Sequence, residues 1–418
     1  MTAAFFPSRA LPAPPRLLAL LCAALTALGE CGAQQFKEFT PGVAYANHST
    51  TATEPPKQLW SIHLVRVDRA RRELEMESAH AKNAALGMAT LSDQIKAVKR
   101  EWGVPVAGVN GDFYERGSSY AGDPRGLQIL HGELISAPTT GASFWVDDAG
   151  NPHTAKVESQ FAVTWPDGTS SEMGLNEDYG TNIVVLHTPA IGAATKTRAG
   201  TTELILERTG EGPWLPLKVG ENFSARVREV RETGATPFAP DTMVLALNPD
   251  FARTLPKVEA GAVLKISTAT TPDVRGARTS ISGGPVLVHE GQKQDLKNTP
   301  KATGPMAEYS YRSMFQRHPR SAVGWNDRSL FLIEVDGRQP GLSMGMKLEE
   351  VAEYMIQLGC TEVMNLDGGG SATMWVNGRV VNSTSESDNG ERPIANSLLV
   401  VRKSSSPGAG AQNARQAP

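Results

Sequence analysis

The alternation of hydrophobic and polar residues predicts a chain built mainly of short strands. Trp60–Val67 alternates in the way that a half-buried strand does. Between 161 and 267, further short β-like runs are separated by Pro, Gly and Asn. These runs are Phe161–Trp165, Thr181–Leu186, Glu203–Leu206, Phe223–Val230, Met243–Leu247 and Ala262–Ser267. We therefore expect an all-β subregion over 161–267, without a clear catalytic motif of its own.

Two distant stretches repeat one order of elements: a helix, a glycine and a short apolar strand. Leu91–Trp102 has apolar residues at helical spacing and precedes the strand Val104–Val109. Leu348–Ile356 has the same kind of spacing and precedes the strand Thr361–Leu366. Each strand ends with an Asn and an Asp two residues apart, which places the two side chains on one face of an extended chain.

The C-terminal third completes the predicted fold. Leu330–Val335 and Ser397–Val401 are predicted to be strands. Asn377-Gly378, a strong hairpin signal, joins Ala372–Val376 to Arg379–Asn382. Together these patterns predict an α+β fold, with mixed sheets, a few packed helices and the all-β middle region.

The first 33 residues have the composition of a secretory signal peptide. Arg9 and Arg16 precede the apolar run Leu17–Leu28, which is too short to span a bilayer. Small residues at positions 31 and 33 place the expected cleavage after Ala33. The alternative is a lipoprotein that is lipidated at Cys31. We expect a mature protein without a transmembrane anchor, exported to the periplasm or secreted.

Composition sets the remaining domain boundaries. Residues 34–59 are polar with small side chains and are expected to form an extended lead-in. The main domain is expected over 60–403. Residues 404–418 are rich in Ser, Gly, Ala, Gln and Pro, and we expect a disordered tail there.

Charge and residue spacing exclude several classes of function. The net charge of −3 over 418 residues gives no electrostatic reason to bind nucleic acid. The eight histidines lack the spacing of a zinc site, and no phosphate-binding loop ending in Gly-Lys-Ser/Thr occurs. We therefore expect no metal and no cofactor. Cys360 lies in an apolar stretch, which favours a buried core thiol over a nucleophile.

Two aspartates at strand ends are the candidate catalytic groups. Asn110 and Asp112 end one of the repeated strands, and Asn365 and Asp367 end the other. Two such ends meeting in space would form one acidic, amide-rich pocket, whereas chance similarity would keep them apart. Paired carboxyl groups are what glycoside cleavage requires. The competing interpretation is that each Asp caps a turn through backbone amides.

Three glycines and a hydroxyl group follow Asp367. Consecutive glycines lack Cβ atoms, so a ligand can approach the backbone closely and the amides can point at it. The asparagines either orient sugar hydroxyls or stabilise turns. The substrate-binding residues expected from this group are Asn110, Asn365, Gly368, Gly369, Gly370 and Ser371.

Residues 276–285 form a second polar group. They include a cation, hydroxyl groups and a pair of glycines, and together these could bind a phosphate. Arg320 beside a strand and Arg392 in a polar loop add further cations. Asp336-Gly337-Arg338 is expected to be a turn. For each arginine, the alternative is a solvated or ion-paired surface side chain. The phosphate- or substrate-binding residues expected here are Arg278, Ser282, Gly283, Gly284, Arg320 and Arg392.

Six motifs then occur in a characteristic order. They are Asn110-Gly111-Asp112-Phe113-Tyr114, Ser282-Gly283-Gly284-Pro285-Val286-Leu287-Val288, Arg320-Ser321-Ala322-Val323-Gly324, Val335-Asp336-Gly337-Arg338, Asn365 to Ser371, and Glu391-Arg392-Pro393. In this order the chain resembles the phosphodiester glycosidases, the family of the N-acetylglucosamine-1-phosphodiester α-N-acetylglucosaminidases or uncovering enzymes. The resemblance runs from about residue 60 to 402 and is strongest from 278 onward.

The resemblance implies an α+β domain that hydrolyses a glycosyl phosphodiester to free sugar and a phosphomonoester. Asp367 is then the main catalytic carboxylate and Asp112 a second acid or base, while Arg278 and Arg320 hold the phosphate. The expected substrate of such an exported bacterial relative is an envelope or extracellular glycan. Two alternatives stay open: a non-catalytic glycan-binding protein, and a phosphodiesterase that cuts the phosphorus–oxygen bond.

Overall fold

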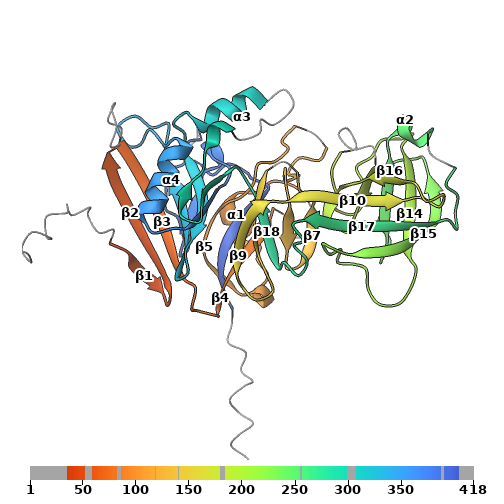
Figure 1. Cartoon of the computed structure of the whole chain (residues 1–418), viewed down its shortest axis with the longest axis horizontal. Coiled ribbons are helices and arrows are strands. Elements are labelled where there is room, and N and C mark those ends of the chain that lie inside the picture. Colours follow the sequence, from red (N-terminus) through yellow and green to blue (C-terminus); the bar gives the residue numbers. More distant parts are fainter. Residues whose placement is uncertain are drawn as a thin grey trace, which may run out of the picture. The chain divides into compact units, whose positions relative to one another are not determined.

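Most of the regular secondary structure is β-strand with few helices, which agrees in broad terms with the expected α+β class. The structure is a computed structural model and describes residues 35–51, 59–81, 86–117, 119–139, 141–178, 184–254, 257–298, 307–386 and 390–403 (Figure 1). The expected signal peptide, 1–33, and the expected tail, 404–418, lie outside the described residues. From Phe36 onward, the described residues belong to one compact unit.

An eight-stranded antiparallel sheet carries several elements that lead to the candidate site. Its strand order is β1-β2-β3-β22-β21-β23-β19-β20. The strands are β1 (Lys37–Thr40), β2 (Val43–Thr51), β3 (Leu59–Asp68), β19 (Val286–His289), β20 (Gln292–Lys293), β21 (Arg320–Trp325), β22 (Ser329–Val335) and β23 (Glu362–Asn365). The stretch expected to be a lead-in therefore supplies β1 and β2, which pair with each other and, through β2, with β3.

Helix α4 (Leu348–Gln357) packs against this sheet over β19, β21 and β23. Its apolar face is buried as the helical spacing predicts, and Val351 and Met355 share one core with Ile62 and Val363 of the sheet. Cys360 follows the helix and is 2% exposed. Burial raises the pKa of its thiol to about 12, so the expectation of a buried core thiol is confirmed.

A five-stranded sheet packs on the other face of the first one. Its strand order is β25-β24-β5-β26-β4, and all its pairs are antiparallel. Val65 and Leu332 of the first sheet share a core with Val109 and Leu398 of this sheet. The strands are β4 (Leu74–His80), β5 (Val104–Asn110), β24 (Met374–Val376), β25 (Arg379–Val380) and β26 (Asn396–Arg402).

Two further sheets contain the middle of the chain. A five-stranded sheet has the order β7-β6-β18-β8-β9 and comprises β6 (Gln128–Leu130), β7 (Glu133–Ser136), β8 (Ala142–Val146), β9 (Pro152–Lys156) and β18 (Thr279–Ser282). An eight-stranded sheet has the order β11-β10-β17-β15-β14-β16-β13-β12. It comprises β10 (Glu158–Thr164), β11 (Ser170–Glu172), β12 (Gly174–Leu175), β13 (Val184–His187), β14 (Thr202–Arg208), β15 (Asn222–Arg231), β16 (Met243–Leu247) and β17 (Val263–Thr271).

This second eight-stranded sheet confirms the expected all-β middle region (Figure 1). Among the described residues, the expectation of mixed sheets holds for this sheet alone, because the other three are wholly antiparallel. Within the described part of the chain, only β12 and β13 pair in parallel, and every other strand pair is antiparallel. Hairpins and longer antiparallel returns join most neighbouring strands, so parallel crossovers are not needed.

The helices are short. The helix expected over 91–102 divides into α1 (Leu91–Lys96) and the 3₁₀ turn η1 (Arg100–Trp102), because Lys99 between them has an extended backbone. The remaining helices are α2 (Pro249–Ala252), α3 (Ala307–Met314) and the 3₁₀ turns η2 (Pro189–Ile191), η3 (Leu296–Asn298) and η4 (Gly369–Ser371). Among the residues described, no helix combines the length and the apolar character needed to cross a membrane.

Candidate active site

The two repeated strand ends meet in space. The main-chain amide of Asp367 donates a hydrogen bond to the carbonyl oxygen of Gly111, at 2.9 Å. The side-chain amide of Asn110 donates to the carbonyl oxygen of Asp367, at 2.7 Å. Because β5 and β23 belong to different sheets, these bonds join the two sheets where both strands end. The convergence expected from the sequence is confirmed.

Asn110 itself is part of the framework at this junction. It is fully buried, and its side-chain oxygen accepts hydrogen bonds from the Ser321 hydroxyl at 2.6 Å and the Thr373 amide at 3.1 Å. Because its side-chain nitrogen donates to Asp367, both polar atoms of the side chain have hydrogen-bond partners. Asn110 therefore stabilises the turn, which was one of the two roles left open, and does not line the cavity.

A cavity of about 580 Å³ lies beside the joined strand ends. This volume falls within the range of roughly 300–1,000 Å³ that is common for small-molecule sites. Most of the residues expected from the sequence line the cavity. They are Asp112, Ser282, Gly283, Gly284, Arg320, Asn365, Asp367, Gly368, Gly369, Gly370, Ser371 and Arg392.

Asp112 is the more deeply buried of the two aspartates, at 2% exposed. Its main-chain amide donates to the side-chain oxygen of Asn396, at 2.8 Å, which fixes the turn after β5. Burial raises the pKa of the Asp112 carboxyl to about 8, and the charge of Asp367 adds to this rise against the lowering effect of the Phe113 and Gly126 amides. At neutral pH, most molecules therefore carry a proton on Asp112.

Asp367 faces the cavity and is partly exposed. Burial raises the pKa of its carboxyl to about 6, and hydrogen bonding by Ser371 and by the Gly368 amide limits the rise. The Gly368 amide donates to Oδ1 at 2.8 Å. Arg392 and Arg125 also favour the ionised form. The two aspartates thus lie in environments that separate their pKa values, as in enzymes where one carboxyl acts as acid and the other stays ionised.

The glycine loop, Gly368–Gly370, allows cations to approach the backbone closely. Gly369 has φ +62°, and a Cβ atom there would lie 3.0 Å from Nη2 of Arg338. A Cβ atom on Gly370 would collide with the Arg392 guanidinium and the Glu386 carboxylate, which form an ion pair with each other. Because glycine has no Cβ atom, both positions leave room for guanidinium groups next to Asp367.

Ser282, Gly283 and Gly284 do not form the predicted phosphate cradle in the structure. The Gly283 amide donates to the Ala142 carbonyl at 3.0 Å, and the Gly284 amide donates to the Asn365 carbonyl at 2.9 Å. Ser282 is 2% exposed, and its hydroxyl bonds the Ser143 hydroxyl at 2.7 Å. These amides and this hydroxyl are engaged within the protein. The segment therefore shapes the cavity wall, and we no longer assign its amides to phosphate.

Two predicted phosphate ligands are also corrected. Arg278 lines a separate cleft and pairs with Glu75, with 3.1 Å between Nη2 and Oε2. Arg320 does line the cavity, but it is 6% exposed, and its guanidinium donates to the carbonyl oxygens of Met346, Ser313 and Gln316. Arg278 is therefore excluded from the site, and Arg320 holds the cavity wall together.

Other cations line the cavity instead. Arg125 and Arg338 have exposed side chains there, and Nη2 of Arg338 lies 3.3 Å from Nδ1 of His318. Burial lowers the pKa of His318 to about 4, with Arg320 and Arg338 adding to the effect, so His318 stays neutral. For Arg338 we favoured a turn over a functional role. Arg125, in the segment Asp123-Pro124-Arg125-Gly126, was missed because an isolated arginine in a turn has no distinguishing pattern.

The sequence also matches a family model. Residues 221–401 match the model described as phosphodiester glycosidase. The similarity to this family is therefore found in the C-terminal part of the chain. The matched segment includes Asp367, the glycine loop and Arg338, whereas Asp112 and Arg125 precede it. The cavity is thus lined both by residues of the matched segment and by residues that precede it.

Two curated proteins are similar to parts of the chain. The uncharacterised SPbeta prophage-derived protein YomE of Bacillus subtilis is 30% identical over 127 residues, which is 30% of this chain and 18% of that protein. The bovine N-acetylglucosamine-1-phosphodiester α-N-acetylglucosaminidase is 31% identical over 107 residues, which is 25% of this chain and 19% of the bovine protein. The similarity therefore spans less than a fifth of each relative.

Solved structures share the fold over most of the chain. A hypothetical protein from Synechocystis superposes with a TM-score of 0.68 at 17% identity, covering 89% of this chain and 64% of that one. The catalytic domain of the zebrafish N-acetylglucosamine-1-phosphodiester α-N-acetylglucosaminidase superposes with a TM-score of 0.50 at 15% identity, covering 87% and 85%. At these identities the likeness shows a shared fold.

Proposed function

We propose that the protein is a hydrolase that cleaves a glycosyl phosphodiester at the anomeric carbon and releases free sugar and a phosphomonoester. The observation that carries this proposal is the pair of aspartates, Asp112 and Asp367, which line one cavity with pKa values raised to different levels. The match of residues 221–401 to the phosphodiester glycosidases supports the same reaction.

The two carboxyl groups divide the proton chemistry between them. Asp112, with a pKa of about 8, enters the reaction protonated and can donate to the departing phosphate oxygen. Asp367, with a pKa of about 6, enters ionised and can act as nucleophile or as base toward water at the anomeric carbon. A phosphate ester is already a good leaving group, so we assign the larger share of catalysis to Asp367.

The arginines supply the complement to an anionic substrate. A phosphodiester carries one negative charge, and the guanidinium group offers paired donors that match two phosphate oxygens. Arg125, Arg338 and Arg392 line the cavity beside Asp367. We assign phosphate binding to these three residues, in place of Arg278 and Arg320.

The sugar is then placed next to the glycine loop. Asn365 lines the cavity at 3% exposed, and its side-chain oxygen has no hydrogen-bond partner among the described residues. A buried amide oxygen without a partner is costly, and a sugar hydroxyl donating to it would remove that cost. Asn365 and the backbone of Gly370 are therefore the proposed sugar contacts, because the Gly368 and Gly369 amides donate to Asp367 and Pro319.

The proposed site of action is outside the cytoplasm. The charged and apolar pattern of residues 1–33 supports a signal peptide that is cleaved after Ala33. An exported phosphodiester glycosidase would meet glycosyl phosphates in envelope polymers and extracellular glycans. We propose such glycans as the substrate class.

The test is hydrolysis of the methyl diester of N-acetylglucosamine 1-phosphate by the purified chain and by Asp367→Asn. General acid–base groups contribute about 10²–10⁴ to the rate, so we expect kcat/KM to fall by about that factor. Asp250→Asn is the control, because Asp250 lies on α2 with an exposed side chain and should leave the rate unchanged. Undiminished turnover in a folded Asp367→Asn protein would remove Asp367 from the mechanism.

Labelled water then separates the competing functions. In ¹⁸O-water, attack at the anomeric carbon puts the label in the sugar, whereas cleavage of the phosphorus–oxygen bond puts it in the phosphate. Label in the phosphate contradicts the proposal. Tight glycan binding without any product, measured by mass spectrometry, would favour a binding protein instead.

A further inference from the structure

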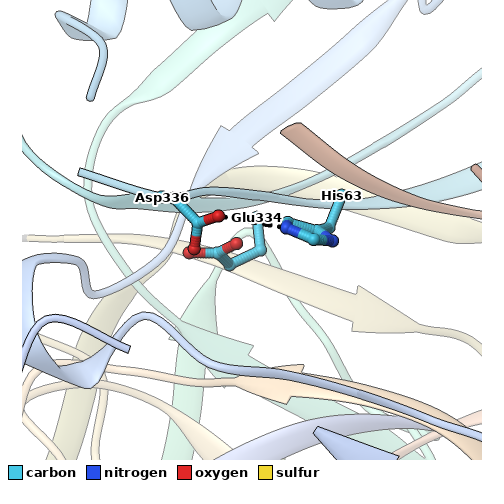
Figure 2. A group of neighbouring side chains, drawn as sticks. All are labelled: His63, Glu334 and Asp336. Carbon is cyan, nitrogen blue, oxygen red and sulfur yellow. Dashed lines mark hydrogen bonds and ion pairs between the residues drawn. The ribbon is translucent and has the colours of Figure 1, made fainter. Parts of the chain in front are cut away.

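A buried group of one histidine and two carboxyl residues lies in the first sheet, outside the lining of the active-site cavity. His63 on β3 is the register partner of Glu334 on the neighbouring strand β22, and Asp336 follows Glu334 by two residues on the same face. Their exposed fractions are 5%, 0% and 1%. One potential ligand atom from each side chain lies within 4.8 Å of the other two, and Figure 2 shows the three groups turned toward one another.

Glu334 has no hydrogen-bond partner in this group. Neither of its carboxyl oxygens has a partner among the described residues, although the side chain is fully buried. Two carboxyl groups in one dry site repel each other unless a cation or a proton lies between them. The unpartnered oxygens therefore indicate a ligand.

We propose that His63, Glu334 and Asp336 bind a divalent transition-metal ion, Mn²⁺ or Zn²⁺. The ligand types fit, because imidazole and carboxylate together suit the harder first-row metals and zinc. The spacing fits as well. With metal–ligand distances of about 2.1 Å, neighbouring ligand atoms in tetrahedral or octahedral sites lie about 3.0–3.4 Å apart. Nε2 of His63 and Oδ2 of Asp336 are 3.1 Å apart.

The groups around these three residues support metal binding. The Tyr45 hydroxyl lies 2.7 Å from Nδ1 of His63, so it can accept a hydrogen bond from a protonated Nδ1 and leave Nε2 for the metal. The Ser383 amide donates to Oδ1 of Asp336 at 2.8 Å, which leaves Oδ2 for the metal. Such outer partners orient histidine and carboxylate ligands in metal sites. Asn47, an exposed residue, borders the group, with its side-chain nitrogen 3.3 Å from both ring nitrogens of His63.

The ion would anchor a segment that continues to the active site. Asp336 holds Ser383 through the amide contact, and the Ser385 hydroxyl donates to the carbonyl of Gly369 at 3.3 Å. Glu386, at the end of this segment, pairs with Arg392. A metal at the group therefore has a structural role, fixing residues 383–386 against the glycine loop without entering the cavity.

The first experiment measures metal binding by the purified full chain after treatment with a chelator. Equilibrium dialysis against Mn²⁺ or Zn²⁺, followed by elemental analysis, should give one ion per chain. Glu334→Gln should weaken binding about tenfold or more, since it removes a charged ligand at constant shape. Glu362→Gln is the control, because Glu362 forms a surface pair with His289 at 3.0 Å and should leave the stoichiometry unchanged. Unchanged binding in Glu334→Gln, or no bound ion in the wild type, overturns the proposal.

A second measurement needs no variant that removes a ligand. X-ray absorption by the metal-loaded wild type should show one imidazole nitrogen together with oxygen ligands. The ion should also raise the melting temperature of the wild type and of Glu362→Gln. A spectrum without an imidazole contribution, or an unchanged melting temperature, contradicts the site and indicates that Glu334 holds a proton instead. Both readouts are independent of catalysis, so a loss of glycosidase activity would not decide them.

Discussion

The amide of Asp367 donates a hydrogen bond to the carbonyl oxygen of Gly111, which immediately precedes Asp112. One main-chain bond therefore links Asp367, the candidate base, to the residue next to Asp112, the candidate acid. The separation of the carboxyl groups is set by backbone of two packed sheets and not by a flexible side chain. Catalytic groups gain most from being held in place before the substrate binds.

The first prediction concerns the pH dependence of kcat/KM. Activity requires Asp367 ionised and Asp112 protonated, so the rate should rise as pH passes about 6 and fall as pH passes about 8. The phosphodiester substrate does not titrate in this window. Asp112→Asn should lose the alkaline limb of the profile and keep the acidic limb. A flat profile across both limbs in the wild type would contradict the proposed roles.

The second prediction concerns the stability cost of burying Asp112. The pKa of Asp112 is about 8 in the folded protein, against an ordinary 3.8, so the folded state binds more protons between these values. The contribution of Asp112 to the free energy of unfolding therefore falls as pH rises through this window. Asp112→Asn should be more stable than the wild type at pH 9, on the order of 6 kcal/mol, and close to it at pH 4.

Urea unfolding at both pH values measures this difference. Other buried acids titrate in both proteins, so the comparison between variant and wild type isolates Asp112. An equal difference at the two pH values would mean that Asp112 has an ordinary pKa.

The third prediction distinguishes the role of Arg338 from that of Arg278. Arg338→Gln should lower kcat/KM for the phosphodiester by about 10–100-fold, because a charge-assisted contact to the phosphate is lost. Arg278→Gln is the matched control and should change it little, since Arg278 pairs with Glu75 in a separate cleft. Steady-state kinetics at two salt concentrations test both. Equal losses in the two variants would favour a general effect of charge over a contact.

The fourth prediction concerns Arg320, which binds three carbonyl oxygens while 6% exposed. Arg320→Met should lower the free energy of unfolding by about 2–5 kcal/mol, because it leaves buried acceptors without donors. Arg253→Met, at an exposed position immediately after α2, should have little effect. Urea unfolding provides the measurement. Full stability of Arg320→Met, together with a large rise in KM, would return Arg320 to the role of phosphate ligand.

Much of the fold follows from local pattern. The bounds of β16 (Met243–Leu247) agree with the prediction, and β22, β26 and α4 agree within a residue or two. These segments have a clear period and clear ends. The helix after Leu91 is shorter than expected, because periodicity does not reveal the extended backbone of Lys99. Sheet order and register depend on distant partners and have no local signal.

The candidate site is partly predictable for the same reason. The repeated strand ends located Asp112 and Asp367, because each pair of polar residues interrupts an apolar strand. Sequence did not show that the Gly283 and Gly284 amides bond within the protein, since partners are set by packing. The group of His63, Glu334 and Asp336 was missed as well. The expectation of no metal came from spacing along the chain, whereas this group depends on the pairing of β3 with β22.

The position of β26 has a consequence for biogenesis. This last strand lies between β4 and β5, and Asn396 at its start accepts the amide hydrogen of Asp112. During synthesis, the first half of the chain emerges with two strands that lack their shared neighbour. A nascent or truncated polypeptide without residues 396–402 therefore lacks the partner that holds the Asp112 amide, so we expect the two candidate catalytic groups to come together only after the final strand has been made.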